Sequence, residues 1–235
     1  RTGKNSWPAR WRLTRVVEGA DRARPVFEQR VSFLRELGWS GKDPGWSWKI
    51  ADEDRLTARN LVKAPYLHLS VNAASTPLNE WPLDDWSESL RQIWKKAPEL
   101  KVLATGAGSE RETARLRDLA ALVNDPRLQI STDRSTVGLL AALLESAELH
   151  VGLDSGVLHL AVGLGKPTVS LFRESAGRPG WAPLGEKHHV LIRDCPCHQT
   201  GRNTCEGSRA LCLSKISPTD VARAVLDSWP RKGKG

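Results

Sequence analysis

The feature of this sequence that most constrains its fold is a regular alternation of short apolar runs with longer amphipathic segments from Ala51 to Trp229. Runs such as Leu149–Leu153 are short and mostly apolar, which is typical of buried strands. Segments such as Leu83–Lys96 place apolar side chains three and four residues apart, as helices that cover a sheet do. Strands that alternate with helices predict an α/β fold with a parallel, doubly wound sheet.

The same patterns give the expected elements. We expect strands at 65–71, 101–105, 128–130, 149–153, 167–172 and 190–193, and helices at 25–37, 52–62, 83–96, 110–123, 136–146, 156–164 and 217–229. The stretch before residue 48 is rich in turn-forming residues outside its one helix, and it is too irregular to form an independent domain. Sheets of this class bind ligands outside the carboxyl ends of their strands, so the loops there are the candidate sites.

The composition argues against two classes of protein. None of the apolar runs approaches the roughly 18 residues that a membrane-spanning helix needs, and no signal peptide stands at the N-terminus. The 235 residues carry a net charge of +8, but most Lys and Arg residues are interspersed with acids, so we expect no nucleic-acid partner. An anionic small molecule or membrane surface fits this charge equally well. Because the sequence contains no Met, we expect the natural chain to begin upstream of Arg1.

Two of the loops that follow predicted strands could contact a nucleotide. The loop from Ser70 to Pro82 combines small hydroxyl and amide side chains with a helix start, which suits a phosphate, although an ordinary capped turn explains it equally well. The loop from Thr105 to Glu112 contains glycines followed by acids. A carboxylate there could accept hydrogen bonds from ribose hydroxyls, or Ser109 could simply cap the next helix with acids in its first turn.

The third loop follows the predicted strand 149–153. Asp154 ends this strand, and Ser155 and Gly156 form the turn into a new helix whose first N–H groups are free. A diphosphate could bind these donors, with Asp154 within reach of a sugar hydroxyl. His159 lies one turn into this helix, where it is either a ligand-binding group or a core histidine with a local hydrogen bond.

Four blocks of the sequence, taken together, resemble the family 9 glycosyltransferases, the heptosyltransferase family of lipopolysaccharide synthesis. The blocks are HLSVNAASTPLNEWPLDDW, ATGAGSERETARL, STVGLLAALLESAELHVGLDSGVLHLAVGLGKPTVSLF and CLSKISPTDVARAV. The pattern D-S-G-x-x-H-L-A followed by G-x-P-T-V-x-L-F is the most specific, and the order and spacing of all four blocks agree. The resemblance extends from roughly Ala51 to Trp229.

The resemblance implies a GT-B fold, in which two Rossmann-like domains face a cleft. It implies that 1–50 is the remnant of an N-terminal acceptor domain and linker, that 51–230 is a complete C-terminal domain that binds the nucleotide sugar, and that 231–235 is a basic tail. The general base of the family belongs to the N-terminal domain, so we expect no catalytic residue within this chain.

The resemblance also implies a set of donor-binding residues: Ala74, Ser75, Thr76, Asn79, Glu110, Ser135, Asp154, Ser155, Gly156, Val157 and His159. Glu110 takes the place of the acid that binds the ribose, and Ser135 takes the place of the backbone group that meets the adenine. This sequence departs from the family at two positions. Asn79 stands where most members carry a Lys that would neutralise the diphosphate, and Arg173 replaces a Gly and could supply the missing cation.

The four cysteines lie close together, as Cys195, Cys197, Cys205 and Cys212. Four thiols in one loop could bind Zn²⁺ or iron as a structural site, although the spacing is not a standard C-x2-C pair. Free thiols and disulfides are the alternatives, and a cytoplasmic setting disfavours disulfides.

The resemblance implies an inverting transfer of a sugar, which we expect to be heptose, from an ADP-sugar to a lipopolysaccharide core or a protein acceptor. The transfer requires no cofactor and takes place in the cytoplasm or at the cytoplasmic face of the inner membrane. Two alternatives remain open from the residues themselves. One is a truncated, non-catalytic nucleotide-binding module, and the other is a sugar-nucleotide epimerase of the same fold.

Overall fold

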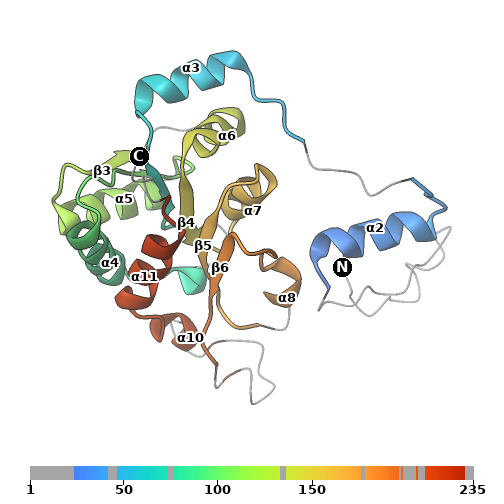
Figure 1. The fold of residues 1–235 in the computed structure, drawn as a ribbon. Helices are drawn as coiled ribbons and strands as arrows, with labels where there is room; N and C mark the ends of the chain where they lie inside the picture. The colour runs from blue at the N-terminus through green and yellow to red at the C-terminus, as the bar shows by residue number, and fades with distance from the viewer. Residues whose placement is uncertain are drawn as a thin grey trace. The chain divides into compact units, whose positions relative to one another are not determined.

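The computed structural model describes residues 24–41, 47–73, 77–132, 136–175, 178–195, 197, 205 and 210–230 (Figure 1). The chain divides into two compact units. The smaller unit, residues 1–45 and 176–182, contains the helix α2 (Val26–Glu36) and the single turn α8 (Arg178–Trp181). The larger unit contains the other elements. The predicted domain boundaries at residues 50 and 230 stay predictions.

The larger unit is built on one sheet of six parallel strands in the order β3-β2-β1-β4-β5-β6. The strands are β1 (Leu67–Ser70), β2 (Val102–Thr105), β3 (Leu128–Ser131), β4 (Leu149–Leu153), β5 (Thr168–Leu171) and β6 (His188–Leu191). The strand order reverses between β1 and β4, which is the place where sheets of this class bind their ligands. The predicted parallel, doubly wound sheet is therefore confirmed.

Helices cover both faces of this sheet (Figure 1). One face carries α4 (Leu83–Lys96), α5 (Glu110–Val123) and α11 (Pro218–Ser228), and the other carries α3 (Asp52–Leu61), α6 (Val137–Ser146) and α7 (Gly156–Gly163). Three short elements, η1 (Pro77–Asn79), α8 and α10 (Leu211–Ser214), were not predicted. The last strand was predicted two residues too late, because β6 lies at the sheet edge and begins with two histidines rather than with an apolar run. None of the described helices is long and apolar enough to cross a membrane.

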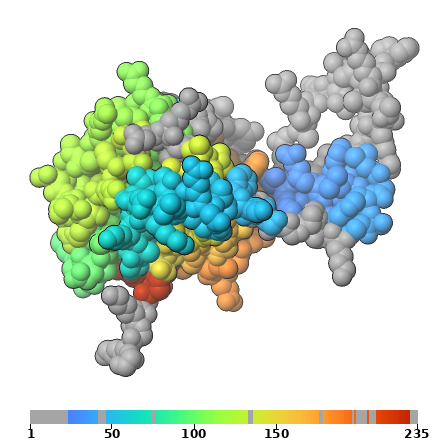
Figure 2. Space-filling view, turned by 90° about the horizontal axis from the view of Figure 1, so that it is seen from above, coloured from blue at the N-terminus to red at the C-terminus, as the bar shows by residue number. Residues whose placement is uncertain are grey.

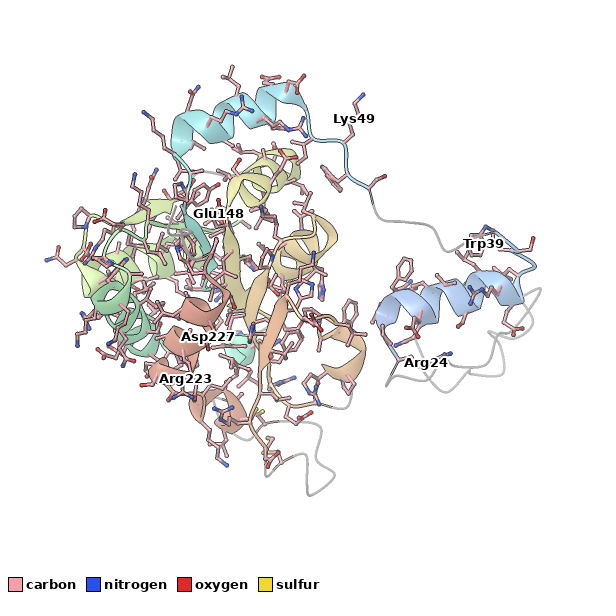
Figure 3. The ribbon with its side chains drawn as sticks, in the orientation of Figure 1. Arg24, Trp39, Lys49, Glu148, Arg223 and Asp227 are labelled. Carbon is pink, nitrogen blue, oxygen red and sulfur yellow. The ribbon has the colours of Figure 1, made fainter. Side chains whose placement is uncertain are left out.

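Tryptophans dominate the core on the α4 face. Trp81 and Trp86 are buried and meet edge to face, with their ring centroids 4.8 Å apart. The indole N–H groups of Trp81 and Trp94 donate to the carbonyls of Ile216 and Leu100 at 3.2 and 2.8 Å, whereas the buried Nε1 of Trp86 has no hydrogen-bond partner among the described residues. This packing fixes α4 and the start of α11 against the strands, and α11 turns its exposed residues Arg223 and Asp227 to solvent (Figure 3).

On the opposite face, α3 packs on α6, and the cyan atoms of α3 lie on the near surface of the larger unit in Figure 2. The Arg55 guanidinium binds both carboxylate oxygens of Glu145, at 2.8 and 3.0 Å, and so ties the two helices together. Tyr66 donates its buried hydroxyl to the carbonyl of Leu143, and burial raises the pKa of this phenol. Because side chains alternate along a strand, His68, Ser70, His150 and Thr105 all face this side of the sheet.

Candidate functional site

A cavity of about 540 Å³ opens at the carboxyl ends of β1, β2 and β4, where the strand order reverses. Its walls come from the segments that follow these strands and from the first turns of α6 and α7. The polar side chains around it include Asn72, Thr105, Glu112, Ser155 and His159. The cavity thus lies where the fold class predicts ligand binding, and it combines apolar walls with a few convergent polar groups.

Asn72 contributes an unsatisfied amide to this cavity. The residue is 6% exposed, and neither Nδ2 nor Oδ1 has a hydrogen-bond partner among the described residues. Gly106 makes room for it, because a Cβ at that position would lie 3.4 Å from Asn72 Nδ2 and 3.1 Å from a methyl of Leu116. Since buried amides are almost always paired, Asn72 has the character of a group that binds a ligand. This role of Asn72 was not predicted from the sequence.

Glu112 is the acid that α5 brings to the cavity. It is 7% exposed, and one of its oxygens, Oε2, accepts a hydrogen bond from the backbone N–H of Ala107 at 2.7 Å. Ser109 caps the same helix by accepting from the Glu112 N–H at 3.3 Å. Glu110, the predicted ribose-binding acid, lies in the same first turn but is exposed and outside the residues that line the cavity. Its role stays a prediction.

The start of α7 forms the opposite wall. Ser155, Gly156 and Val157 line the cavity, and the buried hydroxyl of Ser155 has no hydrogen-bond partner within the described segments. Asp154 lies just before this helix, with Oδ1 at 3.7 Å from Nε2 of His159, a distance that suits an ion pair rather than a hydrogen bond. His159 is half-buried and also lines the cavity. These five predicted residues therefore lie together.

Other predicted residues lie elsewhere or outside the description. Asn79 is half-buried in η1, apart from the cavity lining. Ala74, Ser75, Thr76 and Ser135 lie outside the described residues.

The loop between β1 and α4 is anchored by charges that the sequence analysis missed. The Glu80 side chain is 8% exposed and accepts from Arg111 at 2.6 Å and from the Ala73 N–H at 3.0 Å. Arg115, 3.5 Å from Glu80, donates to the carbonyls of Val71 and Trp81, and burial lowers its pKa. Arg111 and Arg115 are spaced four residues apart on α5, a spacing that places them on one face of this helix. They therefore bring two positive charges to this loop, whereas Glu80 brings one negative charge.

The metal site predicted at the cysteines is not supported. Among the described residues, which include all four cysteines, no group of three or more His, Cys, Asp or Glu side chains is arranged to hold a metal ion. None of the four forms a disulfide. Cys195 and Cys212 are buried within the core, where burial raises the pKa of the Cys212 thiol and its sulfur accepts the Glu174 N–H at 3.3 Å.

Arg173, the predicted replacement cation, contacts one of the four cysteines, Cys205. Its Nη1 lies 3.9 Å from Sγ of Cys205, and the residue is half-buried. Arg173 is not among the residues that line the cavity described above.

Comparison with known proteins places this geometry in a family. The family model described as glycosyltransferase family 9 (heptosyltransferase) matches residues 8–210. The chain is 26% identical over 239 residues to lipopolysaccharide heptosyltransferase 1 of Pseudomonas aeruginosa, covering 93% of this chain and 60% of the relative. The chain therefore spans less than two thirds of that relative's length.

Solved structures share the fold. A family 9 glycosyl transferase from Veillonella parvula matches with a TM-score of 0.71 at 19% identity, covering 92% of this chain and 63% of that one. The E. coli heptosyltransferase with ADP-2-deoxy-2-fluoro heptose matches with a TM-score of 0.61 at 17% identity, covering 94% and 61%. E. coli ADP-heptose lps heptosyltransferase II matches with a TM-score of 0.63 at 17% identity, covering 82% and 56%.

Proposed function

This chain belongs to glycosyltransferase family 9, and on that basis we propose that it is the donor-binding part of an inverting heptosyltransferase. The donor is an ADP-sugar with heptose as the sugar, and the acceptor is a lipopolysaccharide core. The relative from Pseudomonas aeruginosa carries a name that fits this acceptor, and one of the matching E. coli structures contains an ADP-heptose analogue. We place the reaction in the cytoplasm, at the face of the inner membrane.

The cavity between β1 and β4 is the observation that carries this proposal. It presents the Asn72 amide and the Ser155 hydroxyl, neither of which has a partner among the described residues, and the carboxylate of Glu112, within one space of about 540 Å³. A nucleoside offers both donors and acceptors in its base and its ribose, so it can satisfy an amide, a hydroxyl and a carboxylate at once. A purely apolar ligand would leave the Asn72 amide and the Ser155 hydroxyl without the partners that they lack among the described residues.

The charges near the cavity support a diphosphate. The first N–H groups of α7, in the turn that follows Ser155, have no partners within the helix and favour a negative charge. Arg111 and Arg115 add positive charge to the neighbouring β1–α4 loop, where the family resemblance expects a lysine and this chain has Asn79. Preorganised donors of this kind stabilise the nucleoside diphosphate as it leaves.

In the proposed reaction, an acceptor hydroxyl attacks the anomeric carbon from the face opposite the diphosphate, and the bond to the diphosphate oxygen breaks. The hydroxyl proton passes to a base, which we expect in the acceptor-binding part of the enzyme. Asp154 lies just before α7 and His159 lies in its first turn, and Asp154 can accept a hydrogen bond from a sugar hydroxyl.

Calorimetry of the whole chain with ADP, UDP and GDP tests this assignment. We expect ADP to bind most tightly, and Asp154→Ala to weaken the binding of an ADP-sugar more than that of ADP, because the hydrogen bond proposed for Asp154 is to a sugar hydroxyl. Asp227→Ala removes a carboxylate from the exposed face of α11 and should change neither affinity (Figure 3). Preference for UDP would favour the epimerase alternative, and binding of none of the three would refute the donor site.

A further inference from the structure

A pair of buried histidines lies directly beneath the floor of the cavity. His68 on β1 and His150 on β4 are neighbours in the sheet register, both are fully buried, and their Nδ1 atoms are 3.0 Å apart. The other ring nitrogen of His68, Nε2, lies 3.1 Å from the hydroxyl oxygen of Thr105, which lines the cavity. These three side chains form a continuous chain of hydrogen bonds from the core to the candidate donor site.

Both rings are neutral at physiological pH. Burial lowers the pKa of His68 to about 3, and burial together with the neighbouring His68 ring lowers the pKa of His150 well below its ordinary value. A neutral imidazole carries one N–H and one acceptor nitrogen. The contact between the two Nδ1 atoms therefore holds a single hydrogen, and that hydrogen belongs to one ring or the other.

The two arrangements differ at both ends of this series of hydrogen bonds, at His150 Nε2 and at the Thr105 hydroxyl. If His68 carries its hydrogen on Nδ1, its Nε2 accepts the Thr105 hydroxyl hydrogen, and His150 has an N–H at Nε2. If His150 carries its hydrogen on Nδ1, His68 has its N–H at Nε2 and donates it to the Thr105 oxygen. The Thr105 hydroxyl hydrogen is then free for another acceptor.

The surroundings of His150 Nε2 decide between them. This atom is buried and has no hydrogen-bond partner in the part of the chain that the structure describes. Gly152 lies against it, since a Cβ at that position would be 3.0 Å away. Buried N–H groups without a partner are rarer than buried acceptors without one. The arrangement that leaves a lone pair rather than an N–H at His150 Nε2 is therefore favoured.

We infer that the His68–His150 pair orients Thr105 as a hydrogen-bond donor to the bound nucleotide. His150 donates from Nδ1 to His68, His68 donates from Nε2 to Thr105, and Thr105 donates its hydroxyl hydrogen into the cavity. The ligand atom that it meets is a neutral acceptor of the nucleoside, a ring nitrogen of the base or a ribose oxygen. Thr105 thus binds ligand, and the two histidines are positioning residues. The identity of the ligand rests on the proposed function.

The direction of the hydrogen bonds can be read in the free protein by long-range ¹H–¹⁵N correlation NMR, which separates protonated from unprotonated ring nitrogens. We expect the Nε2–H tautomer for His68 and the Nδ1–H tautomer for His150, at neutral pH and without nucleotide. The opposite pair of tautomers would overturn the inference. A merely structural role for the histidines predicts no particular direction, so this readout tests positioning.

The consequence for binding is tested by calorimetry with ADP. Thr105→Val should weaken binding about 3- to 10-fold, the range for one neutral hydrogen bond, whereas Thr105→Ser should remain within about twofold. Thr168→Val is the matched control, because Thr168 is also a buried strand threonine that contacts a histidine ring, His188, at 3.0 Å, but it lies outside the cavity lining.

Unchanged ADP affinity in Thr105→Val, or an equal loss in Thr168→Val, would overturn the donor role of Thr105. If the unmodified chain binds no ADP, the proposed function fails instead. The tautomers, which need no ligand, would still confirm or overturn the direction of the hydrogen bonds.

Discussion

The two acids in the first turn of α5 allow a sharp test of the candidate site. Glu112 lines the cavity and is 7% exposed, whereas Glu110 is exposed and is not among the lining residues. Replacing each by Gln removes one charge at nearly constant size, two residues apart on the same helix. We expect Glu112→Gln to weaken ADP binding and Glu110→Gln to leave it nearly unchanged.

The expected loss of ADP affinity in Glu112→Gln follows from the number of hydrogen bonds that the Glu112 carboxylate can still accept. One of its roughly four lone-pair positions accepts the Ala107 N–H, so the others can accept ribose hydroxyls. A hydrogen bond to a charged acceptor contributes about 1.5–3 kcal/mol and a neutral one about 0.5–1.5 kcal/mol. The Gln variant keeps a neutral acceptor, so the loss is about 1–2 kcal/mol, or about 5- to 30-fold in affinity.

Isothermal titration with ADP measures this difference, and 2′-deoxy-ADP shows whether the ribose is involved. If Glu112 binds the 2′-hydroxyl, the loss caused by Glu112→Gln should shrink when that hydroxyl is absent. Thermal unfolding of both variants controls for loss of the Ala107 contact. A loss of affinity in Glu110→Gln with none in Glu112→Gln would refute the reasoning from burial and support the residue that the family resemblance indicates.

Three further predictions concern the fold. Trp86→Ala should lower the free energy of unfolding by about 3–5 kcal/mol in urea titrations, because it empties a fully buried position; a loss below 1 kcal/mol would contradict the packing. Gly106→Ala should destabilise the chain by about 1–3 kcal/mol, since its Cβ would crowd Leu116, whereas Gly156→Ala meets no atom within 4 Å and should be neutral or stabilising in thermal melts. Hydrogen bonds from Ser217, followed by the charge of Arg193, lower the pKa of Asp220. The ionised Asp220 therefore contributes about 1 kcal/mol to the free energy of unfolding above the ordinary Asp pKa near 3.9, and this contribution is lost as the pH falls below that value. Asp220→Asn should flatten that part of the stability–pH curve, and an unchanged curve would show that the cap contributes nothing.

The fold was predictable because its elements are encoded locally. The bounds predicted for α4 and α5 agree with the structure to the residue, since Pro82 and Ser109 mark their starts and both helices have regular apolar faces. β6 was placed two residues too late because an edge strand pairs on one side only and tolerates His188 and His189. α10 is a single turn without a periodic pattern, and nothing local distinguishes it from a loop.

The candidate site was predictable in part, and the limit has a physical cause. Ser155, Gly156 and His159 follow one strand in one motif, so the motif locates them together. Glu112 occupies the position at which an acid often caps a helix, and the sequence cannot tell whether such an acid is exposed or buried. Only the packing of α5 on the sheet turns Glu112 inward and leaves Glu110 in solvent.

The hydrogen-bonded side chains beneath the cavity are the part of the structure that was least predictable from the sequence. His68 is separated from Thr105 by 37 residues and from His150 by 82 residues. The three side chains meet only because β1 lies between β2 and β4 and because the register pairs His68 with His150. A shift of one residue in that register would turn His150 to the opposite face, among the apolar side chains of the α4 core. A polar site of this kind therefore depends on sheet register, and it becomes visible only when the strands have been aligned.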